Sequence, residues 1–214
     1  MEFCTDMDLL HWEPTLFRDA VFASQELLGG TGDLDGTNFA LNSNLLLVSP
    51  VAANHVIVLG EPLCGSYPIV SVNSPTQLSL MVLYDGLWQS PETDRPVIKG
   101  LSFAIRTFQA QRRVVSDLMK RAAGIEVGST ATPHPQIVNL EAMRRPCVLG
   151  TLQSIYNTLA AAGENPNNYR VRADLYERLY RRALCQVRAE VGLDGDRVVD
   201  VVRRLNVSEL ILPE

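Results

Sequence analysis

The sequence predicts an α+β fold: a helical bundle of about three long helices, a small antiparallel β-module in the N-terminal half and an extended C-terminal arm. Two observations lead to this prediction. Short apolar segments separated by Gly and Pro turn residues fill residues 45–84, whereas apolar side chains recur every three to four positions through residues 101–190. We therefore expect an N-terminal helix with the β-module at residues 1–90, a helical bundle domain at 95–192 and the arm at 193–214.

The N-terminal part is predicted to begin with a helix from Pro14 to Leu28, because apolar residues follow helical spacing there and Gly29-Gly30 would end it. Residues 29–44 are rich in Gly, Asp and Asn and are predicted to form a long loop. Four short strands would then form a small antiparallel sheet or a partial barrel. These predicted strands are Leu45–Val48, His55–Leu59, Tyr67–Val72 and Gln77–Tyr84.

The second half is predicted to be helical after a linker at residues 85–98. The apolar spacing predicts three long helices, at Leu101–Ala123, Leu140–Ala162 and Tyr169–Glu190. Pro146 falls inside the second helix and should kink it or mark a second start. Near the C-terminus, Asn206–Leu212 is apolar and extended in character, so it needs a partner strand or groove in this chain or in the next one.

No segment is long and apolar enough to predict a membrane span, which needs about 20 apolar residues. The N-terminal sequence MEFCTDMD is acidic and lacks the basic start and apolar run of a signal peptide. We therefore expect the protein to stay in the cytoplasm in which it is made.

The formal net charge of -5 is unevenly distributed along the chain. Residues 1–94 carry twelve acidic residues against one Arg, whereas residues 95–214 carry twelve acidic and eighteen basic residues. Either this is a chance imbalance between two solvated surfaces, or an acidic module and a basic module meet, within one chain or between copies. Seventeen of the nineteen basic residues are Arg, which suits bidentate contacts at interfaces but also follows from genome composition.

Motifs for metal or nucleotide chemistry are missing from the sequence. The three histidines, His11, His55 and His134, lie in separate segments without metal-ligand spacing. The glycines at 29–32 follow a predicted helix rather than a strand, which argues against a phosphate-binding loop. The four cysteines form no CxxC pair, and this favours free, mostly buried thiols over disulfides or zinc. They are Cys4, Cys64, Cys147 and Cys185.

A calcium loop is the best of the remaining ion-binding candidates. Asp194, Asp196 and Asp200 occupy relative positions 1, 3 and 7 of an EF-hand loop. Positions 6 and 12 hold Val199 and Leu205, where that loop needs Gly and Glu. A turn is therefore favoured over an ion site, and no cofactor is expected.

The order of these parts resembles a known family of virion proteins. Gly65–Leu80 resembles the small β-module of tailed-phage virion proteins, and Thr107–Ile125 is similar to the first core helix of head-to-tail connector (adaptor) proteins. Tyr176–Leu184 looks like their later helix, and Leu193–Asp196 with Arg203–Val207 resembles their recurrent ending. That ending is richer in Asp and Gly in the family, which weakens the idea of a bound ion in this chain.

The resemblance implies a structural protein of the virion neck, without catalytic activity or cofactor. Such proteins form rings of about twelve copies between the portal and the tail. DNA would pass through the lumen without sequence-specific binding, and the portal and the tail or neck proteins would be its partners. The residues that we expect at the interfaces are Arg178, Arg181, Arg182, Arg203, Arg204, Leu210, Ile211 and Leu212.

Three alternatives stay open. The chain is compatible with another neck or tail component, a stopper or tail terminator, although these tend to be β-dominated. The paired arginines of the second half, such as Arg112-Arg113 and Arg144-Arg145, are compatible with a DNA-binding or packaging module. An enzyme whose site is not recognisable from sequence is the third alternative.

Overall fold

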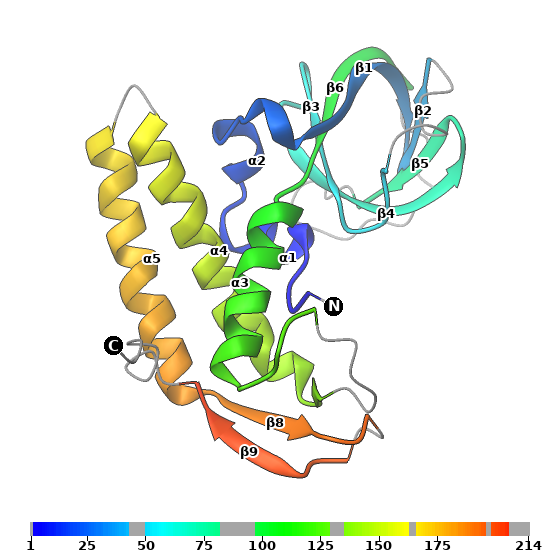
Figure 1. The fold of residues 1–214 in the computed structure, drawn as a ribbon. Helices are drawn as coiled ribbons and strands as arrows, with labels where there is room; N and C mark the ends of the chain where they lie inside the picture. The colour runs from blue at the N-terminus through cyan, green and yellow to red at the C-terminus, as the bar shows by residue number, and fades with distance from the viewer. Residues whose placement is uncertain are drawn as a thin grey trace. The chain divides into compact units, whose positions relative to one another are not determined.

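A computed structural model shows two compact units, which we call the barrel unit and the helical unit (Figure 1). The barrel unit is Thr5–Phe108, and the helical unit combines Met1–Cys4 with Gln109–Glu214. The chain therefore passes from one unit to the other twice, after Cys4 and after Phe108. The residues that the structure describes are 2–42, 50–81, 97–128, 135–162, 166–195 and 198–205.

Six antiparallel strands of the barrel unit close into a barrel in the order β1-β2-β5-β4-β3-β6 (Figure 1). Their bounds are β1 Glu26–Asp35, β2 Asn38–Leu41, β3 Val56–Leu59, β4 Ser66–Ser74, β5 Gln77–Leu80 and β6 Ile98–Arg106. The barrel closes because β1 pairs with β2 on one side and with β6 on the other. Closure leaves no free sheet edge, which removes the usual site of edge-to-edge aggregation.

Apolar side chains that alternate along the strands fill the barrel. On β6, for example, Leu101, Phe103 and Ile105 are buried, and Phe103 meets the Phe39 ring edge-on with centroids 5.2 Å apart. Alternation of period two places such side chains on one face of each strand. The buried residues of this core are Leu34, Phe39, Leu41, Ile57, Leu59, Ile69, Leu78, Leu80, Leu101, Phe103 and Ile105.

The helix predicted from Pro14 to Leu28 is wrong. Two short helices, α1 (Asp6–Trp12) and α2 (Leu16–Asp19), are followed by the 3-10 turn η1 (Ala23–Gln25) and then directly by β1. Thr5 caps α1, because its hydroxyl accepts from the Asp8 N–H while the Asp8 carboxylate accepts from the Thr5 N–H. The apolar residues of this segment thus lie on three short elements rather than on one face of a single helix.

The loop predicted at residues 29–44 is also wrong, because β1 and β2 run through it. One glycine of this segment, Gly32, is needed for close contact within the barrel. A Cβ on Gly32 would lie only 2.5 Å from the Ala40 carbonyl oxygen and 2.5 Å from the Phe39 ring. Glycine at this position lets the neighbouring strand and its aromatic ring approach the backbone of β1.

The predicted fold class is therefore wrong: a closed six-stranded barrel replaces the small β-module, and the chain is not a bundle of three long helices with a sheet attached. Residues from Leu101 were expected to begin the first long helix, but they belong to β6, and the helix begins only at Gln109. The pairing of β6 with both β1 and β3 explains this difference, because those partners are distant in sequence. The predicted strand Leu45–Val48 and most of the predicted linker at 85–98 lie outside the described residues.

The helical unit contains three helices and a small sheet in its described residues. The helix α4 packs along α5 and also contacts α3 (Figure 1). The three strands are antiparallel in the order β7-β8-β9. The bounds are α3 Gln109–Ala122, α4 Leu140–Ala162, α5 Pro166–Gln186, β7 Gln136–Ile137, β8 Arg188–Gly192 and β9 Val201–Arg204.

The helix predicted at Leu140–Ala162 is confirmed, and it continues through the buried Pro146. Its buried Gly150 permits close packing, since a Cβ there would lie 2.9 Å from the Tyr180 ring and from a Val115 methyl group. The last predicted helix is too long, because α5 ends at Gln186. The chain turns there into β8, which forms a hairpin with β9 and also pairs with β7, a strand that lies far away in sequence.

The predicted arm at 193–214 is partly structured. Its strand β9 belongs to the three-stranded sheet, whereas Asn206–Leu212 lies outside the described residues. The favoured turn is present, and the Asp200 carboxylate accepts a hydrogen bond of 2.6 Å from the Leu193 N–H across it. Among the residues that the structure describes, no helix combines the length and apolar character that a membrane crossing requires.

Candidate interaction surface

One face of α5 is fixed against α4 by aromatic packing. Tyr176 lies parallel to Tyr156 of α4, with ring centroids 5.6 Å apart and an interplanar angle of 2°. The buried residues of α5, Ala173, Tyr176, Ala183 and Leu184, follow helical spacing. The opposite face of α5 is therefore turned to solvent.

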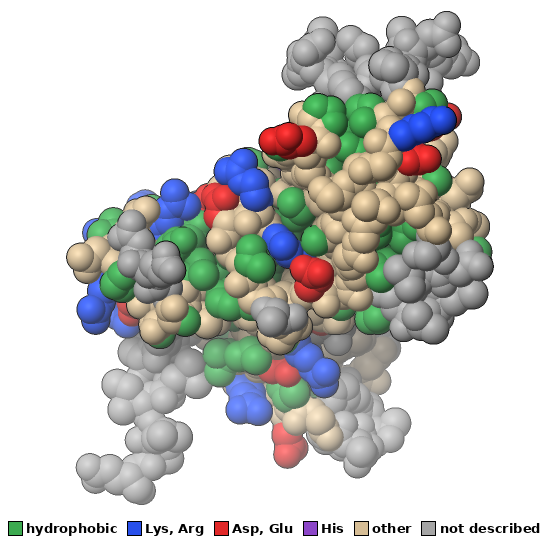
Figure 2. Space-filling view, turned by 90° about the horizontal axis from the view of Figure 1, so that it is seen from above, with side chains coloured by type: hydrophobic (Ala, Val, Ile, Leu, Met, Phe, Trp, Pro, Cys, Tyr) green, Lys and Arg blue, Asp and Glu red, His purple; other side chains and the backbone are tan. Residues whose placement is uncertain are grey.

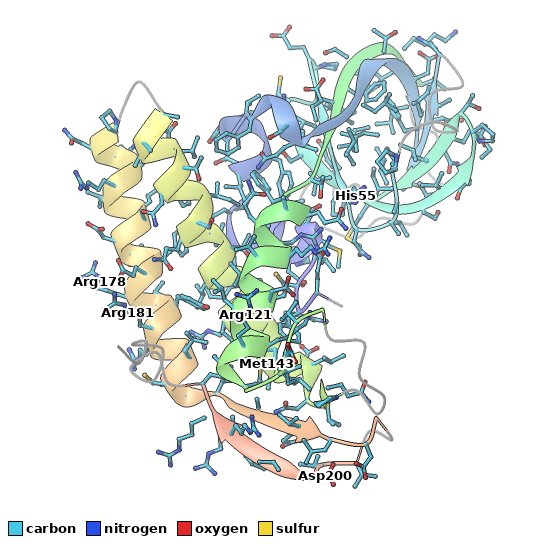
Figure 3. The ribbon with its side chains drawn as sticks, in the orientation of Figure 1. His55, Arg121, Met143, Arg178, Arg181 and Asp200 are labelled. Atoms are coloured by element: carbon cyan, nitrogen blue, oxygen red, sulfur yellow. The ribbon has the colours of Figure 1, made fainter. Side chains whose placement is uncertain are left out.

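Three of the predicted interface residues lie on this outer face of α5. Arg178, Arg181 and Arg182 are all exposed, and Figure 3 shows Arg178 and Arg181 pointing away from α3 and α4. Arg181 forms an ion pair with Glu177 one turn earlier, and the Arg178 Nε donates to the Asp174 carbonyl oxygen over 3.3 Å. Exposed pairs of this kind contribute only about 0.2–1 kcal/mol. Stability of the helix therefore does not explain the three arginines.

The β8–β9 hairpin adds two further arginines. The strand register places Arg188 directly opposite Arg204, and both side chains are exposed. Like charges directly opposite each other on a sheet destabilise it, by about 0.2–1 kcal/mol on the scale of cross-strand pairs. Neither guanidinium group has an ion pair or hydrogen bond with any other residue that the structure describes. The fold of the hairpin therefore does not account for this pair.

Arg203 was predicted at the interface, but its side chain has a structural contact. It is half-buried, and its Nη1 donates over 2.7 Å to the carbonyl oxygen of Ala123, just after α3. Gly124 follows with φ 71°, and a Cβ there would lie 1.8 Å from the Arg203 Nη1. Arg203 thus joins β9 to the end of α3, where an arginine satisfies a carbonyl group that has no partner within the helix.

We define the arginine surface as the exposed arginines of α5, β8 and β9: Arg178, Arg181, Arg182, Arg188 and Arg204. Apolar side chains continue it along α5, where Val171 is 68% exposed and Leu175 is 43% exposed. These two share one helical stripe with Arg178 and Arg182, at steps of four, three and four residues. Basic and hydrophobic side chains also lie close together over the helical unit, toward the left of Figure 2.

The remaining predicted interface residues, Leu210, Ile211 and Leu212, lie outside the described residues. Arg188, by contrast, was missed. Arg188 belongs to the arginine surface because of the register between β8 and β9, for which the sequence carries no local signal.

The residues considered for metal chemistry are separated in the structure. His55, labelled in Figure 3, accepts a hydrogen bond of 3.1 Å from the Ala52 N–H through its Nδ1, within a local turn. His11 is exposed at the end of α1, and His134 and Asp196 lie outside the described residues. The described part of the chain holds no group of three or more His, Cys, Asp or Glu side chains that could bind a metal ion.

Tyr180 is the group with a shifted pKa closest to the arginines in sequence. Burial raises its pKa to about 12, and the negative charge of the Cys147 thiolate adds to the shift. The phenol is therefore neutral near pH 7. Tyr180 contributes packing against α4, where its ring faces Gly150.

Comparisons with protein-family models, with curated proteins and with solved structures give no match to this chain. The arginine surface must therefore be interpreted from its own chemistry.

Proposed function

We propose that this protein is a non-catalytic assembly component, a head-to-tail connector of a tailed bacteriophage that is made in the host cytoplasm and acts in the virion neck. The observation that carries the proposal is the arginine surface, with its exposed arginines and the unfavourable pairing of Arg188 with Arg204. Such a surface suits an acidic partner. The order of sequence segments that resembles connector proteins supports the same function.

The two units supply opposite charges for such an assembly. The barrel unit has eleven acidic and four basic residues, a net charge of -7, whereas the helical unit has thirteen acidic and fifteen basic residues, a net charge of +2. Exposed carboxylates of the barrel unit include Asp35 and Glu61. In a ring, one patch of each copy contacts a different patch of the next copy. The arginine surface of one copy would then meet the acidic barrel unit of its neighbour.

The direct test is the mass of the purified protein at low salt, with negative-stain images of the same sample, alone and mixed with the portal. We expect a ring of about twelve copies, formed alone or on the portal. The double variant Arg182→Glu/Arg204→Glu should fail to form it, because both arginines lack partners within the described chain. Arg18→Glu is a single charge-reversal control outside the arginine surface, since Arg18 is an exposed arginine of the barrel unit.

Two outcomes would contradict the proposal. Ring assembly by the double variant at low salt would show that the arginine surface is not the contact. A small closed dimer without affinity for the portal would rule out the connector function itself and return attention to an unrecognised enzyme site.

A DNA-binding or packaging module is the second candidate, because the same arginines could contact phosphates. Its signature would be a DNA affinity that falls steeply with salt, without ring formation. A stopper or tail terminator is a further neck component to be separated from an adaptor. Because the chain contains a closed barrel as well as helices, its helix content does not distinguish an adaptor from a stopper or a tail terminator. A measurement of binding to the portal is needed to distinguish them.

A further inference from the structure

Two cysteines that are far apart in sequence meet inside the helical unit. The Sγ atoms of Cys4 and Cys147 lie 2.6 Å apart, and the two residues are 143 positions apart in the chain. Both are buried, with exposed fractions of 3% for Cys4 and 0% for Cys147. The other two cysteines, Cys64 and Cys185, are exposed, so the expectation of mostly buried thiols holds only for this pair.

Polar contacts hold the N-terminal segment at residues 2–4 in place against α3. The Phe3 N–H donates to the Ser116 hydroxyl over 3.1 Å, and the Arg112 Nη1 donates to the Cys4 carbonyl oxygen over 2.7 Å. Arg112 also forms an ion pair of 3.0 Å with Glu2. The position of the Cys4 sulfur is therefore set by contacts on the two preceding residues and on its own backbone.

The surroundings of the pair favour a thiolate on Cys147. Its pKa is lowered chiefly by the hydrogen bond from Cys4, with further stabilisation from Ser116, Thr151 and the charge of Arg112. The same contact with Cys147, together with burial, raises the pKa of Cys4, which therefore keeps its proton. A thiolate is the form of cysteine that attacks a disulfide.

We propose that Cys4 and Cys147 are a redox-sensitive pair, which a small disulfide oxidant such as oxidised glutathione converts into a disulfide that fixes the N-terminal segment to α4. Because Cys147 is fully buried, the N-terminal segment must first move away from α4. The Cys147 thiolate would then attack one glutathione sulfur, break the glutathione S–S bond and release the first glutathione as a thiolate. That thiolate takes the proton of Cys4. The Cys4 sulfur then attacks the Cys147 sulfur of the mixed disulfide and releases the second glutathione. Two protein cysteines are oxidised and one oxidised glutathione is reduced.

This disulfide would enclose the entire barrel unit in a covalent loop, because Thr5–Phe108 lies between the two cysteines. Cross-links that close long loops restrict the unfolded chain most strongly. The oxidised protein should accordingly resist denaturant better than the reduced protein. This inference does not depend on the proposed function, since it concerns only the helical unit and its N-terminal segment.

The test uses the full chain with Cys64→Ser and Cys185→Ser, which keeps only the buried pair. After incubation with oxidised glutathione, we expect both remaining thiols to disappear, and peptide mapping by mass spectrometry should recover a Cys4–Cys147 cross-linked peptide from monomeric protein. The guanidinium midpoint should rise relative to a sample reduced with dithiothreitol. Adding Cys4→Ala to this chain should abolish the cross-linked peptide and the shift in midpoint.

Retention of both thiols at oxidant concentrations that fully modify Cys64 and Cys185 in the unaltered chain would overturn the inference. Single glutathionylation of Cys147 without the cross-linked peptide would overturn it as well. The cross-linked peptide is read by mass, so this result stands apart from any effect of Cys4→Ala on folding. Formation of the cross-linked peptide is also independent of ring assembly, which is measured in a separate experiment.

Discussion

Asp6 connects the two ends of the barrel unit through a buried carboxylate. It is fully buried at the start of α1, and its two oxygens accept from the Thr107 hydroxyl over 2.6 Å and from the Phe108 N–H over 3.0 Å. Nearby, the Phe108 ring contacts the Phe17 ring with centroids 4.9 Å apart. One side chain thus links the first helix of the unit to the residues that follow its last strand.

Asp6→Ala should lower the free energy of unfolding by about 3 kcal/mol, because it leaves the Thr107 hydroxyl and the Phe108 N–H buried without their acceptor. Asp6→Asn keeps one acceptor oxygen and should cost about half as much. Chemical denaturation followed by circular dichroism measures both. Asp19→Ala is the control, since the ion pair that this exposed carboxylate forms with exposed Arg18 should contribute less than about 1 kcal/mol. Equal effects of Asp6→Ala and Asp19→Ala would contradict the role of Asp6.

Some single-residue features are readable from local sequence and others are not. The capping box of Thr5 and Asp8 has the expected spacing of three residues, so α1 could have been predicted at its true start. Arg203 could not have been assigned correctly, because its acceptor, the Ala123 carbonyl, lies 80 residues away.

At the scale of elements, α4 shows why one prediction was right and β1 shows why another was wrong. The helix α4 was predicted with its observed bounds because the turn residues that flank it in the sequence, such as Pro135 and Gly163, are a local signal. The strand β1 was read as a helix end and a loop, since the role of its glycines depends on β2 and β6. The long strand thus carries a sequence whose propensity is that of a turn, and tertiary contacts override it.

The two glycines Gly32 and Gly30 of β1 provide a matched pair for testing this explanation. Gly32→Ala should cost about 1–3 kcal/mol, because the added methyl group would lie 2.5 Å from Ala40 and Phe39 atoms. Gly30→Ala has its nearest neighbour, the Phe103 ring, at 3.4 Å and should change stability by less than about 1 kcal/mol. Guanidinium denaturation compares the two variants. A smaller loss for Gly32→Ala than for Gly30→Ala would refute the close-packing role.

At the scale of the whole molecule, the barrel unit is one continuous segment with its own core, its own helix cap and the Asp6 connection. The helical unit is discontinuous, because residues 2–4 belong to it while Thr5–Phe108 does not. The sequence could not predict this division, since barrel closure pairs β1 with β6 across a wide sequence separation. Likewise, Arg188 and Arg204 meet only through the strand register.

We expect the fragment Thr5–Phe108 to fold alone, with a cooperative thermal transition and a far-ultraviolet spectrum dominated by strands. The fragment Gln109–Glu214 should be less stable than the same fragment with residues 1–4 joined to its N-terminus by a flexible linker, because Phe3 and Cys4 are buried in the helical unit. The midpoints of thermal unfolding, measured for the three fragments, test both expectations. Identical midpoints for the last two would mean that the N-terminal segment contributes nothing to the helical unit.

The discontinuous helical unit also imposes an order on biosynthesis. Cys4 leaves the ribosome 143 residues before Cys147, and at typical elongation rates this delay is roughly 7 to 30 seconds. The barrel unit is complete in the chain during that interval, whereas α4 and α5 are not yet made. Residues 2–4 therefore cannot make their contacts in the helical unit until α3 and the start of α4 have been synthesised, so their docking follows the synthesis of the whole barrel unit.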